Sequence, residues 1–106
     1  VRGEALGDLG GLRLAYKAYH RSLKGKPAPV IDGLTGDQRF FISFARLWGT
    51  QATQEYERLQ LQTDPHPVPK SRANETLKNV PEFREAFGCK LGDPMVRPPE
   101  KQCKLW

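Results

Sequence analysis

Apolar side chains recur at every third or fourth position along the first part of the chain. The series consists of Leu9, Leu12, Tyr16, Tyr19 and Leu23. Because an α-helix completes a turn in about 3.6 residues, this spacing places all five side chains along one helix face. The pattern predicts an amphipathic helix over residues 5–24 that ends near Gly25.

A second helical pattern follows a stretch that is rich in proline and glycine. Residues 24–36 contain two prolines and several glycines, which predicts a loop. Thr35 and Gln38 have the spacing of a capping box, in which each side chain satisfies a backbone N–H of the other residue at a helix start. The wide apolar stripe that follows consists of Phe40, Phe41, Phe44, Leu47 and Trp48, and continues after a break near Gly49 through Tyr56, Leu59 and Leu61. We expect more helix after that break, and we expect this part of the chain to form the core.

Proline dominates the pattern in the second half of the chain. Residues 64–70 read D-P-H-P-V-P-K, which predicts a stiff, non-helical loop around His66. Asn79 and Glu82 have the spacing of another capping box, and the helix that they start is expected to end at Gly88 after Phe83 and Phe87. The proline-rich sequence of residues 89–106 predicts an irregular tail. In no stretch do apolar and polar residues alternate for long enough to indicate a strand. The pattern therefore predicts a mainly α-helical chain.

Composition limits the classes to which the chain can belong. With 106 residues, 38% of them hydrophobic and 27% charged, it has the size and composition of one globular domain or part of one. No apolar run approaches the roughly 18 residues that span a bilayer, and no signal peptide is recognisable. The net charge of +5 would suit an anionic partner, but the basic residues are scattered among twelve acidic ones. A solvated surface is the favoured interpretation, and a basic helical binding module without catalytic activity is the alternative.

Few residues have the chemistry of a catalytic or metal site. Glu4 and Asp8 would lie one turn apart on one helix face, as metal-binding carboxylates or as acids that favour the positive end of the helix dipole. The only histidines are His20, expected at the surface, and His66, which is held on a rigid loop. A zinc site needs three or four ligands, so the chain cannot build one from the visible motifs alone. Cys89 and Cys103 have no zinc-finger spacing; each has a partner outside the chain, pairs with the other, or has none.

The whole chain resembles the neprilysin and endothelin-converting-enzyme family of M13-type zinc metallopeptidases. Its first residues, G-E-A-L-G-D-L-G-G-L, resemble the family motif G-E-N-x-A-D-x-G-G-L. The resemblance continues through D-Q-R-F-F-I-S-F-A-R-L-W, T-D-P-H-P, T-L-K-N-V-P-E-F-R-E-A-F-G-C and the terminal C-K-L-W. It implies the helical C-terminal part of a thermolysin-like catalytic domain, whose HExxH helix would lie upstream.

The resemblance implies a metal-binding role for the first helix. In the family, two histidines and a catalytic glutamate come from HExxH, which this chain lacks. Glu4 matches the third zinc ligand, and Asp8 matches the acid that orients a zinc-bound histidine. The intact enzyme is expected to use one zinc ion to hydrolyse short peptides. This segment alone is expected to bind zinc weakly and to be inactive.

The resemblance also assigns roles at the substrate. His66 would donate a hydrogen bond to the oxyanion, with Asp64 holding that histidine in orientation. Arg72 would bind a substrate backbone carbonyl, and Leu47 and Trp48 match residues that line the S1′ pocket, although a core role is equally compatible with their pattern. Cys89 and Cys103 match cysteines that usually bridge to upstream partners, which implies an extracytoplasmic location, with any membrane attachment through an anchor elsewhere in the parent chain.

The chain departs from the family pattern at a few positions. Ala5 replaces the asparagine that follows the zinc-binding glutamate, Gly7 replaces the usual alanine, and Gly49 stands where a cysteine is common. The segment after His66 also differs. These changes affect the expected peptide preference rather than zinc binding. A degenerate homologue kept as an interaction domain is a third hypothesis.

Overall fold

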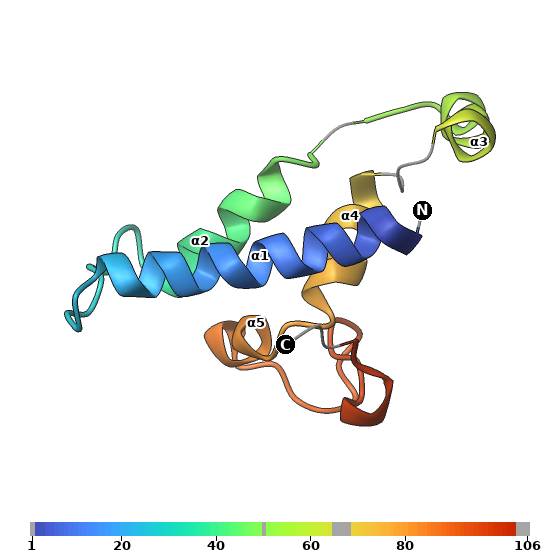
Figure 1. The fold of residues 1–106 in the computed structure, drawn as a ribbon. Helices are drawn as coiled ribbons and strands as arrows, with labels where there is room; N and C mark the ends of the chain where they lie inside the picture. Colours follow the sequence, from blue (N-terminus) through green and yellow to red (C-terminus); the bar gives the residue numbers. More distant parts are fainter. Residues whose placement is uncertain (1, 50, 65–68, 104–106) are drawn as a thin grey trace.

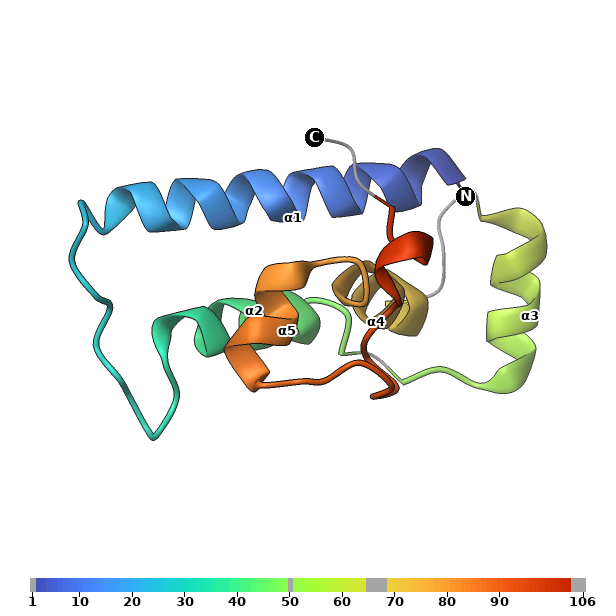
Figure 2. The ribbon, with the colours of Figure 1, turned by 90° about the horizontal axis from the view of Figure 1, so that it is seen from below.

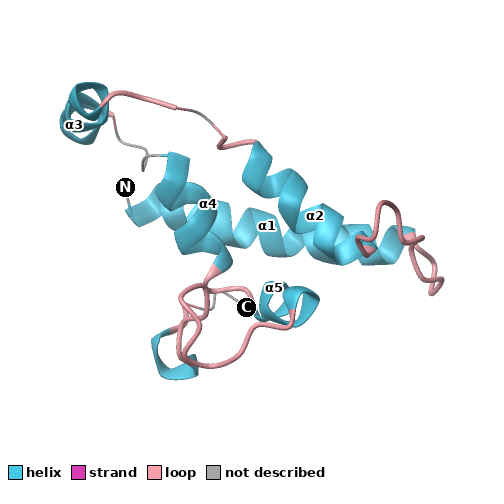
Figure 3. Cartoon of the chain, turned by 180° about the vertical axis from the view of Figure 1, so that it is seen from behind, coloured by secondary structure: helices cyan, strands magenta, loops and turns pink. Residues whose placement is uncertain are grey.

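The computed structural model of the chain is built from helices and loops. It describes residues 2–49, 51–64 and 69–103. The helices are α1 (Arg2–Ser22), α2 (Gly36–Arg46), α3 (Gln54–Thr63), α4 (Pro69–Leu77), α5 (Pro81–Phe87) and a short 3₁₀ turn at Pro99–Lys101. Within these described ranges the only β-type pairing is an isolated bridge between Ile31 and Leu34. The mainly α-helical prediction is confirmed (Figure 3).

The longest helix, α1, runs alongside the others and covers the core. Figure 2 shows α2, α4 and α5 on one side of α1, and Figure 1 shows α1 crossing α4, with α2 above it and α5 below it. The buried core consists of Leu9, Leu12, Phe41, Leu77 and Val80. Phe41 is only 1% exposed, and its ring stacks on Tyr16 of α1 and meets Phe83 of α5 edge to face. The predicted apolar face of α1 is therefore confirmed, although the helix runs from residue 2 to residue 22 rather than from 5 to 24.

The start of α2 is fixed by the predicted capping box. The Thr35 hydroxyl accepts from the backbone N–H of Gln38 at 3.1 Å, and the Gln38 side chain accepts from the backbone N–H of Thr35 at 3.0 Å. The amide nitrogen of the same Gln38 side chain donates to the carbonyl of Ala86 in α5 at 2.9 Å. Next to the cap, Gly36 is buried so tightly that a β-carbon there would overlap the hydroxyl of Tyr19. These contacts hold the first turn of α2 between α1 and α5.

Helix α4 was not predicted, and its N-terminal end contradicts the expected loop over residues 64–70. It begins at Pro69 because proline is well tolerated in the first turn of a helix, where its missing N–H needs no partner. From there it packs against α1 and α2 and buries Ala73, Thr76 and Leu77. Pro69 therefore marks a helix start, and residues 65–68 of the predicted loop lie outside the described residues.

The second predicted capping box is wrong. The N-cap of α5 is Val80, whose side chain makes no capping bond. Asn79 instead donates to the Glu75 carbonyl at 2.7 Å and accepts from the backbone N–H of Cys103 at 2.9 Å. It thus ties the tail to the end of α4. The predicted end at Gly88 is confirmed, since this residue has the left-handed φ of 64° that glycine adopts most easily.

Helix α3 confirms the expected continuation but does not join the core. None of its residues is buried, and its three large apolar side chains, Tyr56, Leu59 and Leu61, are each more than half exposed. It stands apart from the other helices, near the end of α1 that carries the N-terminus (Figures 1 and 2). No helix in the described part of the chain is long and apolar enough to cross a membrane.

Candidate functional site

The N-terminal half of α1 presents the two predicted acidic residues. Glu4 and Asp8 are four residues apart in one continuous helix, so their side chains project from the same face. Glu4 is exposed, whereas the Asp8 side chain is only 14% exposed because it lies beside the core residue Leu9 and under α4. The two carboxylates therefore have different surroundings, because Glu4 is exposed to solvent and Asp8 is largely buried.

Arg72 of α4 forms a side-on ion pair with Asp8. Its Nε lies 2.7 Å from one carboxylate oxygen and its Nη2 lies 2.8 Å from the other. This two-point geometry matches the planar guanidinium to the planar carboxylate, and hydrogen bonds between charged groups are stronger than neutral ones. These bonds raise the pKa of the Arg72 guanidinium, and the negative charges of Asp8, Glu4 and Asp64 act in the same direction. Three of the predicted site carboxylates thus act electrostatically on Arg72.

Trp48 covers a face of the same guanidinium. The Arg72 Cζ lies 4.0 Å from the centre of the Trp48 ring, a distance typical of a cation–π contact. Trp48 reaches this place because the chain continues beyond α2 in a tightened turn, with the N–H groups of Leu47 and Trp48 bonded to the carbonyls three residues earlier. The two adjacent side chains consequently point in different directions.

Leu47 faces an open apolar groove between α1 and α2. The Leu47 side chain is exposed, and the groove has a volume of about 460 Å³. Its other lining residues are Gly7, Asp8, Gly11, Leu12, Ala15, Phe40, Ser43 and Phe44. With an exposed fraction of 72%, Leu47 is not a core residue, so the core interpretation is wrong for this position, and its place in an S1′ pocket remains a prediction. Trp48 is absent from the lining of this groove and is half-buried instead.

Of the two remaining predicted residues, the structure describes only Asp64, at the end of α3. Asp64 is half-buried, ends α3 as its C-cap, and accepts a bond from the Gln60 side chain at 3.4 Å. His66 lies outside the described residues, so its predicted role at the oxyanion remains a prediction. The structure thus brings Asp8 and Arg72 together with Trp48, and places Glu4 and Asp64 within electrostatic reach of Arg72.

The donor set of this cluster suits one part of a metal site. Among residues 2–49, 51–64 and 69–103, no group of three or more potential ligands surrounds a common point. Glu4 is exposed and carries a carboxylate, which is a suitable zinc ligand, and the carboxylate of Asp8 is bound by Arg72. The residues therefore fit zinc only if further ligands come from elsewhere.

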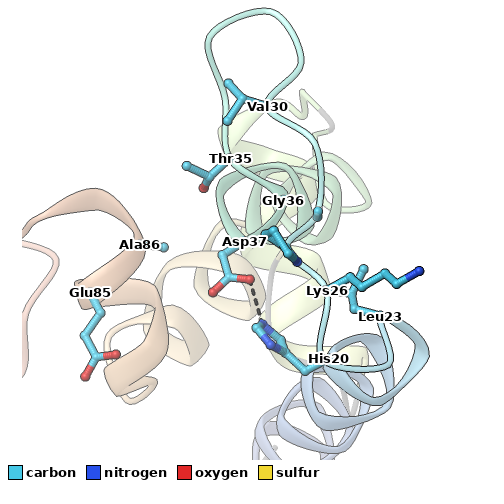
Figure 4. A pocket seen from close by; sticks show the side chains of 12 residues that line it. His20, Leu23, Lys26, Val30, Thr35, Gly36, Asp37, Glu85 and Ala86 are labelled. Carbon is cyan, nitrogen blue, oxygen red and sulfur yellow. Dashed lines mark hydrogen bonds and ion pairs between the residues drawn. The ribbon is translucent and has the colours of Figure 1, made fainter.

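A second polar cluster lies at the opposite end of α1 and was missed in the sequence. Asp37 accepts from the Tyr16 hydroxyl at 2.8 Å and lies 2.7 Å from Nε2 of His20. Burial and the bond to Asp37 raise the pKa of Tyr16. The pair of His20 and Asp37 borders a cavity of about 790 Å³ between the loop after α1, the start of α2 and α5 (Figure 4). The four-residue spacing of Tyr16 and His20 was the available signal, because it places both rings on one helix face.

The structure tests whether the two cysteines pair with each other. Cys89 and Cys103 are both half-buried free thiols, so they do not bridge to each other in this structure.

Arg13, Arg72 and Arg97 each pair with a carboxylate of the same chain, which reduces the positive charge available to an anionic partner.

Similarity to known proteins extends over almost the entire chain. The sequence model of peptidase family M13 matches residues 1–103. Neprilysin-1 of Caenorhabditis elegans is 42% identical over 111 residues, and endothelin-converting enzyme 1 of Homo sapiens is 42% identical over 108 residues. These matches cover 100% and 98% of this chain, but the chain spans only 14% of the length of each relative.

Solved structures agree in fold as well as in sequence. The crystal structure of the Mycobacterium tuberculosis zinc metalloprotease Zmp1 with an inhibitor superposes with a TM-score of 0.94 at 43% identity. A glycoprotein complex from Haemonchus superposes with a TM-score of 0.87 at 37% identity. These alignments cover 98% and 97% of this chain, and 16% and 19% of the respective chains.

Proposed function

Because the chain belongs to peptidase family M13, we propose that it is the C-terminal segment of the catalytic domain of a zinc-dependent metalloendopeptidase that hydrolyses short peptides. One observation carries this proposal. Asp8 of α1 and Arg72 of α4 meet in a two-point ion pair, and the resemblance assigns the first to orienting a zinc-bound histidine and the second to binding substrate. A solvated acidic first turn would not require an arginine from a helix so distant in the sequence.

In this proposal, Glu4 supplies one of the protein ligands of a zinc ion. The other ligands, and the glutamate that acts on water, come from an HExxH helix in a part of the protein upstream of this segment. When bound, zinc supplies Lewis-acid chemistry: it polarises the scissile carbonyl and lowers the pKa of a water molecule. The segment alone, with one ligand, binds zinc weakly and does not hydrolyse peptides.

Asp8 connects the metal side of the site to the substrate side. A carboxylate has about four lone-pair positions, and the side-on pair with Arg72 uses one on each oxygen. The remaining lone pairs can accept the N–H of a zinc-binding histidine and so fix the orientation of its ring. We propose this second role for Asp8 because its carboxylate is already held rigidly in place.

Arg72, His66 and Asp64 act on the substrate in this proposal. The Arg72 guanidinium has five N–H donors, of which Asp8 takes two, and we assign donors on its other edge to a substrate backbone carbonyl. His66 donates to the oxyanion as it forms, and Asp64 orients His66. Leu47 and the apolar groove beside it provide the S1′ pocket, which receives an apolar substrate side chain.

The proposal includes the surroundings of the intact protein. Cys89 and Cys103 form disulfides with upstream cysteines, which requires an oxidising, extracytoplasmic location. Any attachment to a membrane comes from an anchor elsewhere in the protein. The partners of the site are peptides, and the upstream part of the same domain completes it.

The test is zinc content and peptide hydrolysis in the full-length protein. Glu4→Gln is expected to strip the metal, whereas His66→Phe is expected to keep zinc but lower turnover by about 100-fold or more, the usual effect of removing an oxyanion donor. Glu57→Gln, at an exposed residue of α3, and His20→Phe, at the other histidine, are matched controls. If Glu4→Gln retains zinc and activity like the Glu57 control, the proposal is wrong.

A further inference from the structure

We infer that Trp48 is a positioning residue, whose indole face holds the Arg72 guanidinium in the orientation that receives the substrate backbone. The inference rests on the proposed function, because that function makes Arg72 the substrate-binding residue. It differs from the expectation drawn from the sequence, in which Trp48 is a wall of the S1′ pocket.

Two contacts constrain the guanidinium in complementary ways. The side-on pair with Asp8 holds one edge of the plane, with N–O distances of 2.7 and 2.8 Å. An edge contact alone allows the plane to tilt about that edge. The Trp48 ring, 4.0 Å from Cζ, lies over the face of the plane and opposes such tilting. Together the contacts leave the edge opposite Asp8 in a fixed direction.

The surroundings of Trp48 favour a role for its ring face. Its Nε1 is enclosed and has no hydrogen-bond acceptor among the described residues, so the indole N–H does not explain its placement. Phe44 meets the ring edge to face at a centroid distance of 6.5 Å and supports it from within α2. The adjacent Leu47 lines the apolar groove, whereas Trp48 does not. In this structure Leu47 therefore contacts the groove, and Trp48 contacts the arginine.

Preorganisation explains why such support affects catalysis. An arginine has many rotamers, and ordering it during substrate binding opposes binding. An arginine that is already held needs little further ordering when the substrate arrives. Removing the ring should therefore weaken the action of Arg72 on substrate without removing the guanidinium itself.

The experiment is a double-mutant cycle in the full-length protein, with zinc content checked for every variant. The substrate is a fluorogenic peptide that has an apolar residue after the scissile bond. Arg72→Met is expected to lower kcat/KM about 10- to 100-fold through loss of a charged hydrogen bond. Trp48→Leu, which keeps apolar bulk but has no ring, is expected to lower kcat/KM about 3- to 30-fold in the wild-type background. In the Arg72→Met background the same change is expected to cost less than about twofold.

The matched variant Trp48→Phe keeps a ring face, and its kcat/KM is expected to lie above that of Trp48→Leu. If Trp48→Leu lowers kcat/KM by the same factor in both backgrounds, Trp48 acts independently of Arg72 and the inference is overturned. A full-length wild-type protein that holds zinc but cleaves no peptide would refute the proposed function instead. In that case thermal unfolding of the wild type, the two single variants Trp48→Leu and Arg72→Met, and the double variant tests the inference separately. If the changes in Tm caused by the two substitutions are additive, the two residues are not coupled and the inference is overturned.

Discussion

The ion pair between Asp8 and Arg72 should stabilise the chain far more than an ordinary surface pair. Its two side chains are only 14% and 17% exposed, and both oxygens of the carboxylate accept a bond. A hydrogen bond to a charged group contributes about 1.5–3 kcal/mol, whereas an exposed ion pair contributes about 0.2–1 kcal/mol. Asp8→Asn keeps the size and one acceptor oxygen but removes the charge. We expect it to lower the free energy of unfolding by about 2–3 kcal/mol.

Urea unfolding, followed by far-ultraviolet circular dichroism, measures this difference because α-helix is the main regular structure of the chain. Asp32→Asn is the matched control, since Asp32 lies in the exposed loop after α1 and has a positive φ that asparagine also adopts easily. It should change the free energy of unfolding by less than about 0.5 kcal/mol. Arg72→Met and the double variant complete a cycle, with an expected coupling energy of about 1.5–3 kcal/mol.

The reasoning would be refuted by a small or additive effect. If Asp8→Asn lowers the free energy of unfolding by no more than the Asp32 control, the pair behaves like a solvated surface pair. If the double variant equals the sum of the single ones, Asp8 and Arg72 do not interact in solution. Either result would also remove the observation on which the proposed function depends.

Two other predictions concern a glycine contact and the dependence of stability on pH. Gly36→Ala should lower the free energy of unfolding by about 1–3 kcal/mol, because the new β-carbon would overlap Tyr19. Gly11→Ala, whose β-carbon would meet no neighbouring element within 4 Å, should raise it by about 0.5–1 kcal/mol. Urea unfolding of both variants tests this difference in sign. The hydrogen bond from Lys78 lowers the pKa of Glu75 in the folded state. The Glu75 carboxylate therefore stabilises the chain above its unfolded pKa of about 4.3, and this contribution disappears as the pH falls through the lower folded pKa. Glu75→Gln should thus reduce the urea midpoint at about pH 6 but hardly at all at about pH 2, and an equal reduction at both pH values would contradict the assignment.

The elements that the sequence predicts correctly depend on local chemistry. The apolar face of α1, the capping box at Thr35 and the glycine end of α5 each involve residues within a few positions of one another. Local rules failed where a distant partner competes. The side chain of Asn79 does not cap α5, because its oxygen accepts from the backbone N–H of Cys103, 24 residues away. Proline periodicity alone also could not distinguish a loop over residues 64–70 from the helix start at Pro69.

At the candidate site, too, local sequence predicts single residues, whereas their contacts depend on distant parts of the chain. Resemblance indicated Glu4, Asp8 and Arg72 individually, but the pairing of Asp8 with Arg72 spans 64 positions and follows only from the packing of α4 on α1. The separation of Leu47 from Trp48 was likewise invisible, because both belong to one stripe at helical spacing. Their directions are set by the tightened turn after α2, which the pattern of apolar residues does not encode.

The side chain of Gln38 has a consequence for the motions of the chain. It closes the cap of α2 through one atom and holds the Ala86 carbonyl of α5 through another. Fraying of either helix end therefore breaks a bond that the other end uses. The start of α2 and the end of α5 should open as one cooperative unit, and their backbone amides should exchange hydrogen for deuterium at similar rates. Gln38→Ala would separate the two helix ends into independently opening units.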